Sequence, residues 1–202
     1  MISIALIFAA ASLSSPSVVE AERAYAAMAQ KDGQWTAFRA TAAPRAVLFV
    51  PDPVDAASWL QGKKDPPAAV KWQPAAAFVA CDGKTAVTTG PWQRPTSVGY
   101  FTTIWSRPGT TWHWNVDFGG QLETALPAAP TEVPVRRASC QRSKLGLLPK
   151  SDAAKKSADG SSPDRSLEWT WRVEKDGSRH ILVYLWNGHS YDVVIDNRLP
   201  AS

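Results

Sequence analysis

One strand-like segment, 111–118, carries the two side chains best suited to proton transfer. His113 and Asp117 alternate there with mainly apolar residues, several of them tryptophan. Residues two or four apart in a β-strand point to the same face, so these two side chains are predicted to share one face. A buried carboxylate with a raised pKa can act as a general base, and an imidazole beside it can pass the proton on. His113 and Asp117 are therefore the candidate catalytic residues.

Each candidate also has a simpler structural explanation. Asp117 stands near the end of its segment, before Phe118-Gly119-Gly120, where a carboxylate commonly caps a turn. His113 would then lie on an exposed outer face of the strand. Both explanations stay open from the sequence alone.

Four aromatic side chains are candidates for a ligand pocket: Tyr100, Trp92, Trp59 and Trp105. Tyr100 and Trp92 could grip the ring of a ligand, and Trp59 could cover it. The chain contains ten tryptophans, and an exposed stripe of them would suit stacking against sugars or bases. Most of them fall at alternating strand positions, as a packed core requires. Core packing is thus the alternative for each aromatic candidate.

Motifs for nucleophilic catalysis, phosphate binding and metal binding are absent from the sequence. It contains no Gly-x-Ser-x-Gly, no phosphate-cradling glycine loop and no zinc-ligand spacing. We therefore predict no metal and no cofactor. The net charge of +4 is too small to predict nucleic-acid binding. The basic stretch 136–156 lacks interleaved aromatic residues and is interpreted as a solvated tether.

The two cysteines, Cys81 and Cys140, are a candidate disulfide pair. A pair of cysteines in an exported chain can form one bridge. The alternative is two separate buried thiols, since a free cysteine packs as a small hydrophobic residue.

Residues 1–16 are predicted to be a signal peptide. The run 2–13 is apolar, uncharged and too short for a stable membrane anchor, and small residues that suit cleavage follow it. The protein would then be periplasmic or secreted. It would have no stable membrane insertion after cleavage, because no later segment is long and apolar enough. No Lys or Arg precedes the run, so a buried N-terminal helix or a misassigned start is the alternative.

The first part of the chain is predicted to be helical. Ser17 and Glu20 form a capping box that begins a helix, and Gly33 ends it. Its apolar stripe is predicted at Ala21, Ala24, Tyr25 and Met28. A second helix (34–43), a short strand (46–50) and a helical turn within 51–60 are predicted to follow.

The middle of the chain changes to a period of two residues. Turn dipeptides such as Asp82-Gly83 separate its segments. One strand is predicted to place Trp105 on one face, and the next is predicted to place Trp112, Trp114 and Val116 together. Strands are predicted over 72–80, 85–93, 97–106, 111–118 and 133–140.

The C-terminal part is predicted to be a separate element joined by a linker. Residues 143–166 are polar and charged, which is typical of a flexible linker. Alternating hydrophobicity over 167–202, with turns at Asp176-Gly177 and Asn187-Gly188, predicts a three-stranded β-meander. So small a sheet buries little by itself, so we expect it to pack on the main sheet or to extend it.

Three segments carry a resemblance to a known family. They are Thr88-Thr89-Gly90-Pro91-Trp92, then 99–105 (GYFTTIW), then 112–117 (WHWNVD). Together with the order of the elements, they resemble an uncharacterised, often exported, SnoaL-like group. That group lies within the nuclear transport factor 2-like superfamily of ketosteroid isomerase-like proteins. The resemblance covers 17–142.

The resemblance implies a fold and a place for a ligand. The fold would be α+β, with N-terminal helices packed on a strongly curved antiparallel sheet, a cystatin-like cone, plus the C-terminal meander. A cavity at the open end of the cone would bind a small molecule. Homodimers through the open sheet face are common in this superfamily. Isomerase members carry an Asp base and an acidic oxyanion hole, whereas here only Asp117 and Tyr100 match such a role in part.

The expected function is that of an exported protein whose cavity binds a small molecule or mediates self-association. One alternative is an enzyme that performs Asp-assisted proton transfer, similar to an isomerase or hydrolase. Another is a structural, envelope-associated interaction protein. The lack of a complete catalytic set favours a non-catalytic role.

Overall fold

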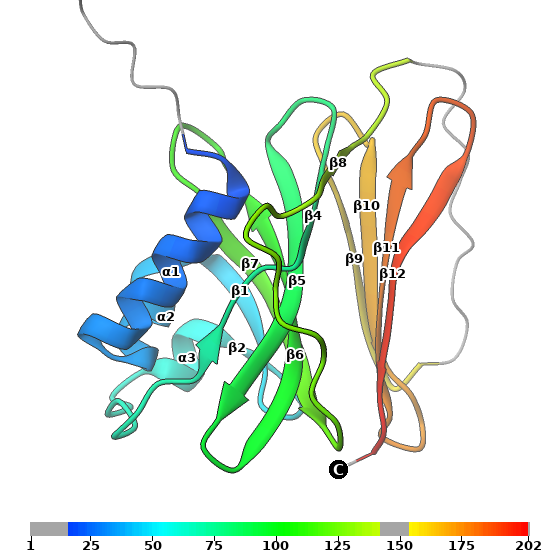
Figure 1. Ribbon diagram of the computed structural model, residues 1–202. Helices are drawn as coiled ribbons and strands as arrows, with labels where there is room; N and C mark the ends of the chain where they lie inside the picture. The colour runs from blue at the N-terminus through cyan, green and yellow to red at the C-terminus, as the bar shows by residue number, and fades with distance from the viewer. Residues whose placement is uncertain (1–15, 142–153, 202) are drawn as a thin grey trace, which may run out of the picture.

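The computed structural model describes residues 16–141 and 154–201, which form three layers (Figure 1). Three helices cover one face of an eight-stranded sheet, and a four-stranded sheet covers the other face. The predicted signal peptide, apart from Pro16, lies outside the described residues. Across the described residues, no helix is both long and apolar enough to span a membrane.

The helices begin and end at the signals that the sequence contains. The backbone amide of Ser17 donates to Glu20 Oε2 over 2.7 Å, and that of Glu20 donates to Ser17 Oγ over 3.2 Å, which completes the predicted capping box. Gly33 follows with φ 108°, a value that glycine adopts without steric cost. The three helices are α1 (Val18–Asp32), α2 (Gln34–Thr41) and α3 (Ala56–Leu60).

The buried face of α1 differs from the predicted stripe. Ala24 is exposed, and the fully buried Glu22 lies in the middle of the face instead. Tyr25 is common to both stripes, and Ala21 and Met28 pack partly buried against the core, so the prediction is wrong for Ala24 and in leaving out Glu22. Glu22 was left out because a charged residue is normally assigned to solvent. The residues that α1 buries are Val18, Val19, Glu22, Tyr25, Ala26 and Ala29.

The large sheet is mixed, which corrects the prediction of a purely antiparallel sheet. Its order is β2-β1-β7-β6-β5-β4-β8, with β3 beside β5, and the pairs β1–β7 and β4–β8 are parallel. Alternating hydrophobicity gives no strand direction, so these long-range pairs could not be read from it. The strands are β1 (Ala42–Phe49), β2 (Pro53–Asp55), β3 (Lys71–Trp72), β4 (Ala76–Val79), β5 (Thr85–Arg94), β6 (Ser97–Ser106), β7 (His113–Leu122) and β8 (Val135–Arg137).

The C-terminal sheet has four strands rather than the predicted three. Its order is β12-β11-β10-β9, and β9 (Lys156–Ser161) falls within the predicted linker. This edge strand is polar and lacks an apolar alternation, so its composition resembled a linker. Gly160 lets the Trp169 ring pack closely against this strand, since a Cβ at that position would lie 2.0 Å from the ring. The other strands are β10 (Leu167–Val173), β11 (Arg179–Trp186) and β12 (Tyr191–Leu199).

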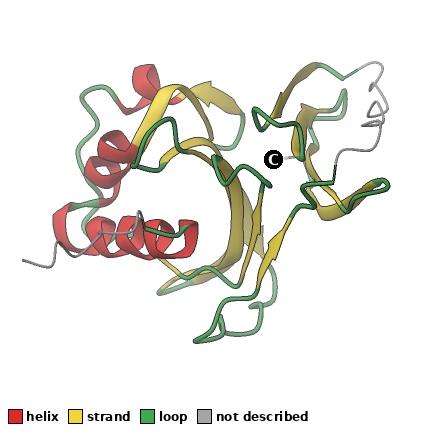
Figure 2. Cartoon of the chain, turned by 90° about the horizontal axis from the view of Figure 1, so that it is seen from above, coloured by secondary structure: helices red, strands yellow, loops and turns green. Residues whose placement is uncertain are grey.

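The second sheet packs on the face of the large sheet that the helices leave open (Figure 2). Asn197 Nδ2 donates to Thr102 Oγ1 across this contact over 2.9 Å. A disulfide joins Cys81, after β4, to Cys140, after β8. The shared core contains Tyr100, Ile104, Val116 and Phe118 from the large sheet and Leu167, Trp171, Ile181, Val183 and Leu185 from the second.

Candidate functional site

A cavity of about 190 Å³ lies between the helices and the large sheet. Its walls are mainly aromatic. Trp35 and Phe38 come from α2, Trp72 from β3 and Phe101 from β6. The Trp35 and Phe38 ring centroids are 5.4 Å apart with planes at 84°, and those of Phe38 and Trp72 are 6.3 Å apart. These edge-on contacts give the cavity a rigid apolar wall.

Asp117 supplies an acidic group to this cavity from β7. Its carboxyl forms no hydrogen bond or ion pair with any other described residue. Burial, and to a lesser degree the charge of Glu22, raises the pKa of Asp117 to about 8. Gly119 and Gly120 continue β7 rather than forming a turn, so Asp117 is not the turn cap that the alternative explanation required.

A β-bulge in β7 decides which face carries Asp117. Ile104 lies opposite Val116, but its neighbour Trp105 lies opposite Trp114, so Asn115 is an extra residue in β7. Trp114 therefore packs toward the helices, whereas Val116 packs toward the second sheet. The predicted common face of Trp114 and Val116 is wrong.

The same bulge separates the two candidate catalytic residues. His113 precedes the extra residue and lies on the face opposite Trp114, away from the helices, whereas Asp117 lies on the helix side. The imidazole Nδ1 of His113 is buried and has no hydrogen-bond partner among the described residues. The predicted His113–Asp117 pair on one face is wrong, because regular alternation was assumed through the bulge.

A second buried carboxyl, Glu22, lies on α1 facing the sheet, with no solvent-exposed surface. Its Oε1 accepts from Trp72 Nε1 over 2.7 Å. Its Oε2 accepts from Thr88 Oγ1 over 2.5 Å and from Trp105 Nε1 over 3.0 Å. Burial raises the pKa of Glu22 to about 7, although the three donors act in the opposite direction.

Hydroxyl groups lie between and beside the two carboxyls. Thr88, Thr103 and Asp117 are direct neighbours across β5, β6 and β7, so they form one row on the helix-facing side. The hydroxyls of Thr103 and Tyr25 are buried and have no partner among the described residues. Burial raises the pKa of Tyr25 well above its usual value, so its hydroxyl stays protonated. The hydroxyls of Thr103 and Tyr25 can therefore each donate a hydrogen bond to a polar atom placed beside them.

Two of the predicted pocket residues border the cavity, but they contribute differently. Trp92 lines it, and its Nε1 donates to the main-chain oxygen of Tyr100 over 3.0 Å. The Tyr100 ring packs with Phe118 between the two sheets, and its hydroxyl donates to the Arg198 main-chain oxygen over 3.3 Å. The Tyr100 hydroxyl is thus directed away from Asp117.

The other two predicted pocket residues lie outside this cavity. Trp59 packs edge-on against Trp35 with a centroid distance of 5.1 Å, one layer behind the wall. Trp105 is buried in the Glu22 hydrogen-bond network. It also borders a separate hollow of about 470 Å³ beside Trp112.

Sequence reasoning missed Glu22, Tyr25 and Thr103, which neighbour Asp117 without lining the cavity. One signal was available, because Glu22 lies four residues after Val18 and three before Tyr25, in the middle of an apolar helical stripe. An acid at such a position is buried only where a partner compensates it. The described residues contain no group of three or more His, Cys, Asp or Glu side chains that could hold a metal ion.

A scan against protein-family models finds no match for this chain, and a search of curated proteins finds no similar sequence.

Proposed function

We propose that this protein binds a small, mainly apolar molecule in the cavity between the helices and the large sheet. The observation that carries this proposal is the Asp117 carboxyl, which lines an aromatic cavity and has no hydrogen-bond or ion-pair partner among the described residues. With its pKa raised to about 8, this carboxyl is mainly protonated at neutral pH and can donate a hydrogen bond to the ligand. A polar group in an apolar pocket of this kind fixes the orientation of a ligand.

The size of the cavity limits the ligand. Its volume is about 190 Å³. Pockets for drug-sized ligands are larger, roughly 300–1,000 Å³. The ligand would therefore be about the size of a single substituted ring or a short chain, smaller than a steroid.

The proposal is consistent with the resemblance described above. In this proposal the large sheet is the curved wall of a cone, the chain is a SnoaL-like member of the superfamily, and it acts after export to the periplasm or the cell exterior. Self-association through the open sheet face is disfavoured, because the second sheet packs on that face. A monomer is therefore proposed.

The binding proposal can be tested with phenol as the probe. Phenol should shift the indole N–H resonances of Trp72 and Trp92 in the full chain. Val70→Phe should abolish these shifts, because Val70 lines the cavity and the larger ring fills it. Val135→Phe, on the exposed edge strand β8, is the matched control and should leave binding unchanged. Equal shifts in the Val70 variant, with its fold intact, would contradict the proposal.

A second candidate function is proton transfer by Asp117. The raised pKa of Asp117, close to neutrality and inside a cavity, favours it. With 5-nitrobenzisoxazole, the carboxylate would take the ring C–H proton, the freed electron pair would complete a nitrile, and the N–O bond would break to release a phenolate. The rate should rise as pH increases through about 8, because the ionised form is the base. Asp117→Asn should abolish catalysis and His113→Asn should not; a rate equal to buffer alone would exclude this function for such substrates.

A further inference from the structure

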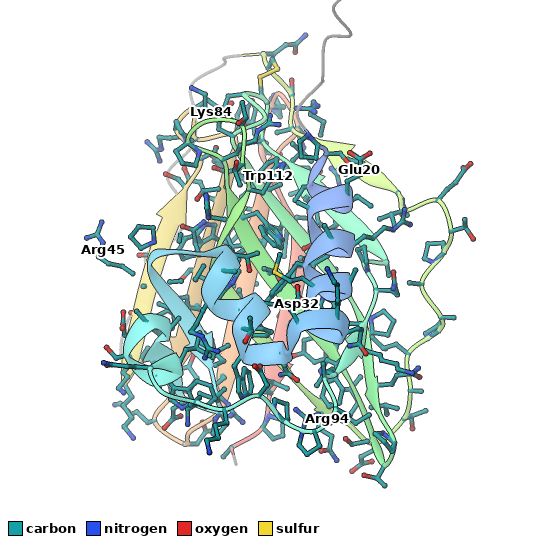
Figure 3. The ribbon with its side chains drawn as sticks, turned by 90° about the vertical axis from the view of Figure 1, so that its left-hand side faces the viewer. Glu20, Asp32, Arg45, Lys84, Arg94 and Trp112 are labelled. Atoms are coloured by element: carbon teal, nitrogen blue, oxygen red, sulfur yellow. A yellow bond between two sulfur atoms is a disulfide. The ribbon has the colours of Figure 1, made fainter. Side chains whose placement is uncertain are left out.

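Arg94 supplies a positive charge at the outer end of the cavity. It lines the cavity from the end of β5, and its side chain is exposed. The guanidinium carbon lies 5.6 Å from the centroid of the Trp92 ring, so the cation lies over an aromatic face. No carboxylate among the described residues pairs with it. Figure 3 places Arg94 at the end of the molecule opposite Lys84 and Trp112.

The acidic end of the site lies at a distance from this cation. Asp117 lies in the same row across the sheet as Thr88, and Thr88 and Arg94 lie on the same face of β5, about 20 Å apart along the strand at about 3.3 Å per residue. The long Arg94 side chain stacked on Trp92 spans part of that distance. Between the two ends lie aromatic walls, including Phe101. The cavity thus has the Asp117 carboxyl at one end, an apolar middle and a cationic rim at the other end.

This arrangement favours an anionic ligand and fixes the orientation in which the ligand binds. A guanidinium presents paired N–H donors that match a carboxylate, and it cannot lose its charge. At the inner end, the Asp117 carboxyl would repel an anion whenever it is ionised. An anionic group therefore has one favourable position, at the rim.

We propose that the ligand of this cavity is a small organic acid, with its ring or short chain against the aromatic wall and its carboxylate at Arg94. This inference rests on the binding function proposed above and assigns Arg94 as the residue that determines specificity. A neutral ligand of the same shape would fill the cavity but would leave the Arg94 charge unused.

The experiment compares 3-phenylpropionate with its uncharged amide, 3-phenylpropanamide, by calorimetric titration of the full chain. The acid should bind about tenfold more tightly than the amide, as expected for one charge-assisted contact. Arg94→Gln should remove this preference by weakening binding of the acid. Lys175→Gln, at an exposed turn of the second sheet, removes the same charge at a residue that does not line the cavity and should change neither affinity. Added salt should weaken binding of the acid only.

The possible failures are distinguishable. Equal affinity for acid and amide, or an Arg94→Gln variant that keeps the preference, overturns the assignment of an organic acid and leaves the binding function in place. Binding of phenol without binding of either the acid or the amide also overturns the assignment of an organic acid and leaves the binding function in place. If phenol, acid and amide all fail to bind, the binding function falls and this inference falls with it.

Discussion

At the scale of single residues, the central feature is a pair of neighbouring carboxyls, of which Glu22 is fully buried and Asp117 is partly buried at the cavity wall. Glu22 has three hydrogen-bond donors, whereas Asp117 has none among the described residues. Burial raises the pKa values of both, to about 7 and about 8. The charge of Glu22 adds to the rise in the pKa of Asp117. The site therefore changes its charge close to neutral pH.

These raised pKa values predict how the stability of the protein depends on pH. Between about pH 4 and pH 8 the folded state holds more protons on Glu22 and Asp117 than the unfolded state, because both pKa values are higher when folded. The unfolding free energy should thus fall as pH rises through this window. Asp117→Asn should be less sensitive to pH, and at pH 8 it should be more stable than the unaltered protein. Urea unfolding at pH 5 and pH 8 measures both effects; a variant as pH-sensitive as the parent would contradict the burial of Asp117.

At the scale of elements, two irregular features position the site. The bulge at Asn115 brings Asp117 onto the helix-facing side, as described above. The second feature is the start of α2, where Gly33 has no side chain to cap the helix. Asp65, from the loop after α3, caps this helix instead. Its carboxylate accepts hydrogen bonds from the Thr36 amide over 3.0 Å and from the Thr36 hydroxyl over 2.6 Å. This contact holds the helix that presents Trp35 and Phe38 to the cavity.

At the scale of the whole molecule, the two sheets depend on each other. The second sheet packs its apolar face against the large sheet. Without the second sheet, the large sheet would expose an apolar patch made of Tyr100, Ile104, Val116 and Phe118. A face of this kind favours aggregation. The C-terminal sheet is therefore part of the core, rather than an appendage on a tether.

This dependence predicts a single cooperative unfolding transition. Ile181 is fully buried between the sheets, and Ile181→Ala should lower the unfolding free energy by about 2–5 kcal/mol. The indole N–H signals of Trp72, beside the helices, and Trp171, between the sheets, should be lost at one common, lowered midpoint. Val193→Ala, at a position 54% exposed, should have little effect. Two separate transitions, with only the Trp171 signal shifted, would show that the sheets unfold independently.

The sequence alone determined the features that depend on near neighbours in the chain. The Ser17–Glu20 capping box and Gly33 define α1, and β6 has the bounds predicted for it, because caps and alternation act over a few residues. Asp117 was identified as the leading candidate, and the structure places it in the cavity. Cys81 and Cys140, a candidate pair in the sequence, form a disulfide.

Only the tertiary structure decided how distant segments meet. The parallel pairing of β1 with β7, the edge strand β9 and the packing of the second sheet depend on contacts that no local period encodes. Regular alternation does not predict the bulge at Asn115, and because of this bulge His113 lies on the face of β7 opposite to that of Asp117. Glu22 and Asp117 come close only when α1 packs on the sheet, and their raised pKa values follow from the burial that this packing creates.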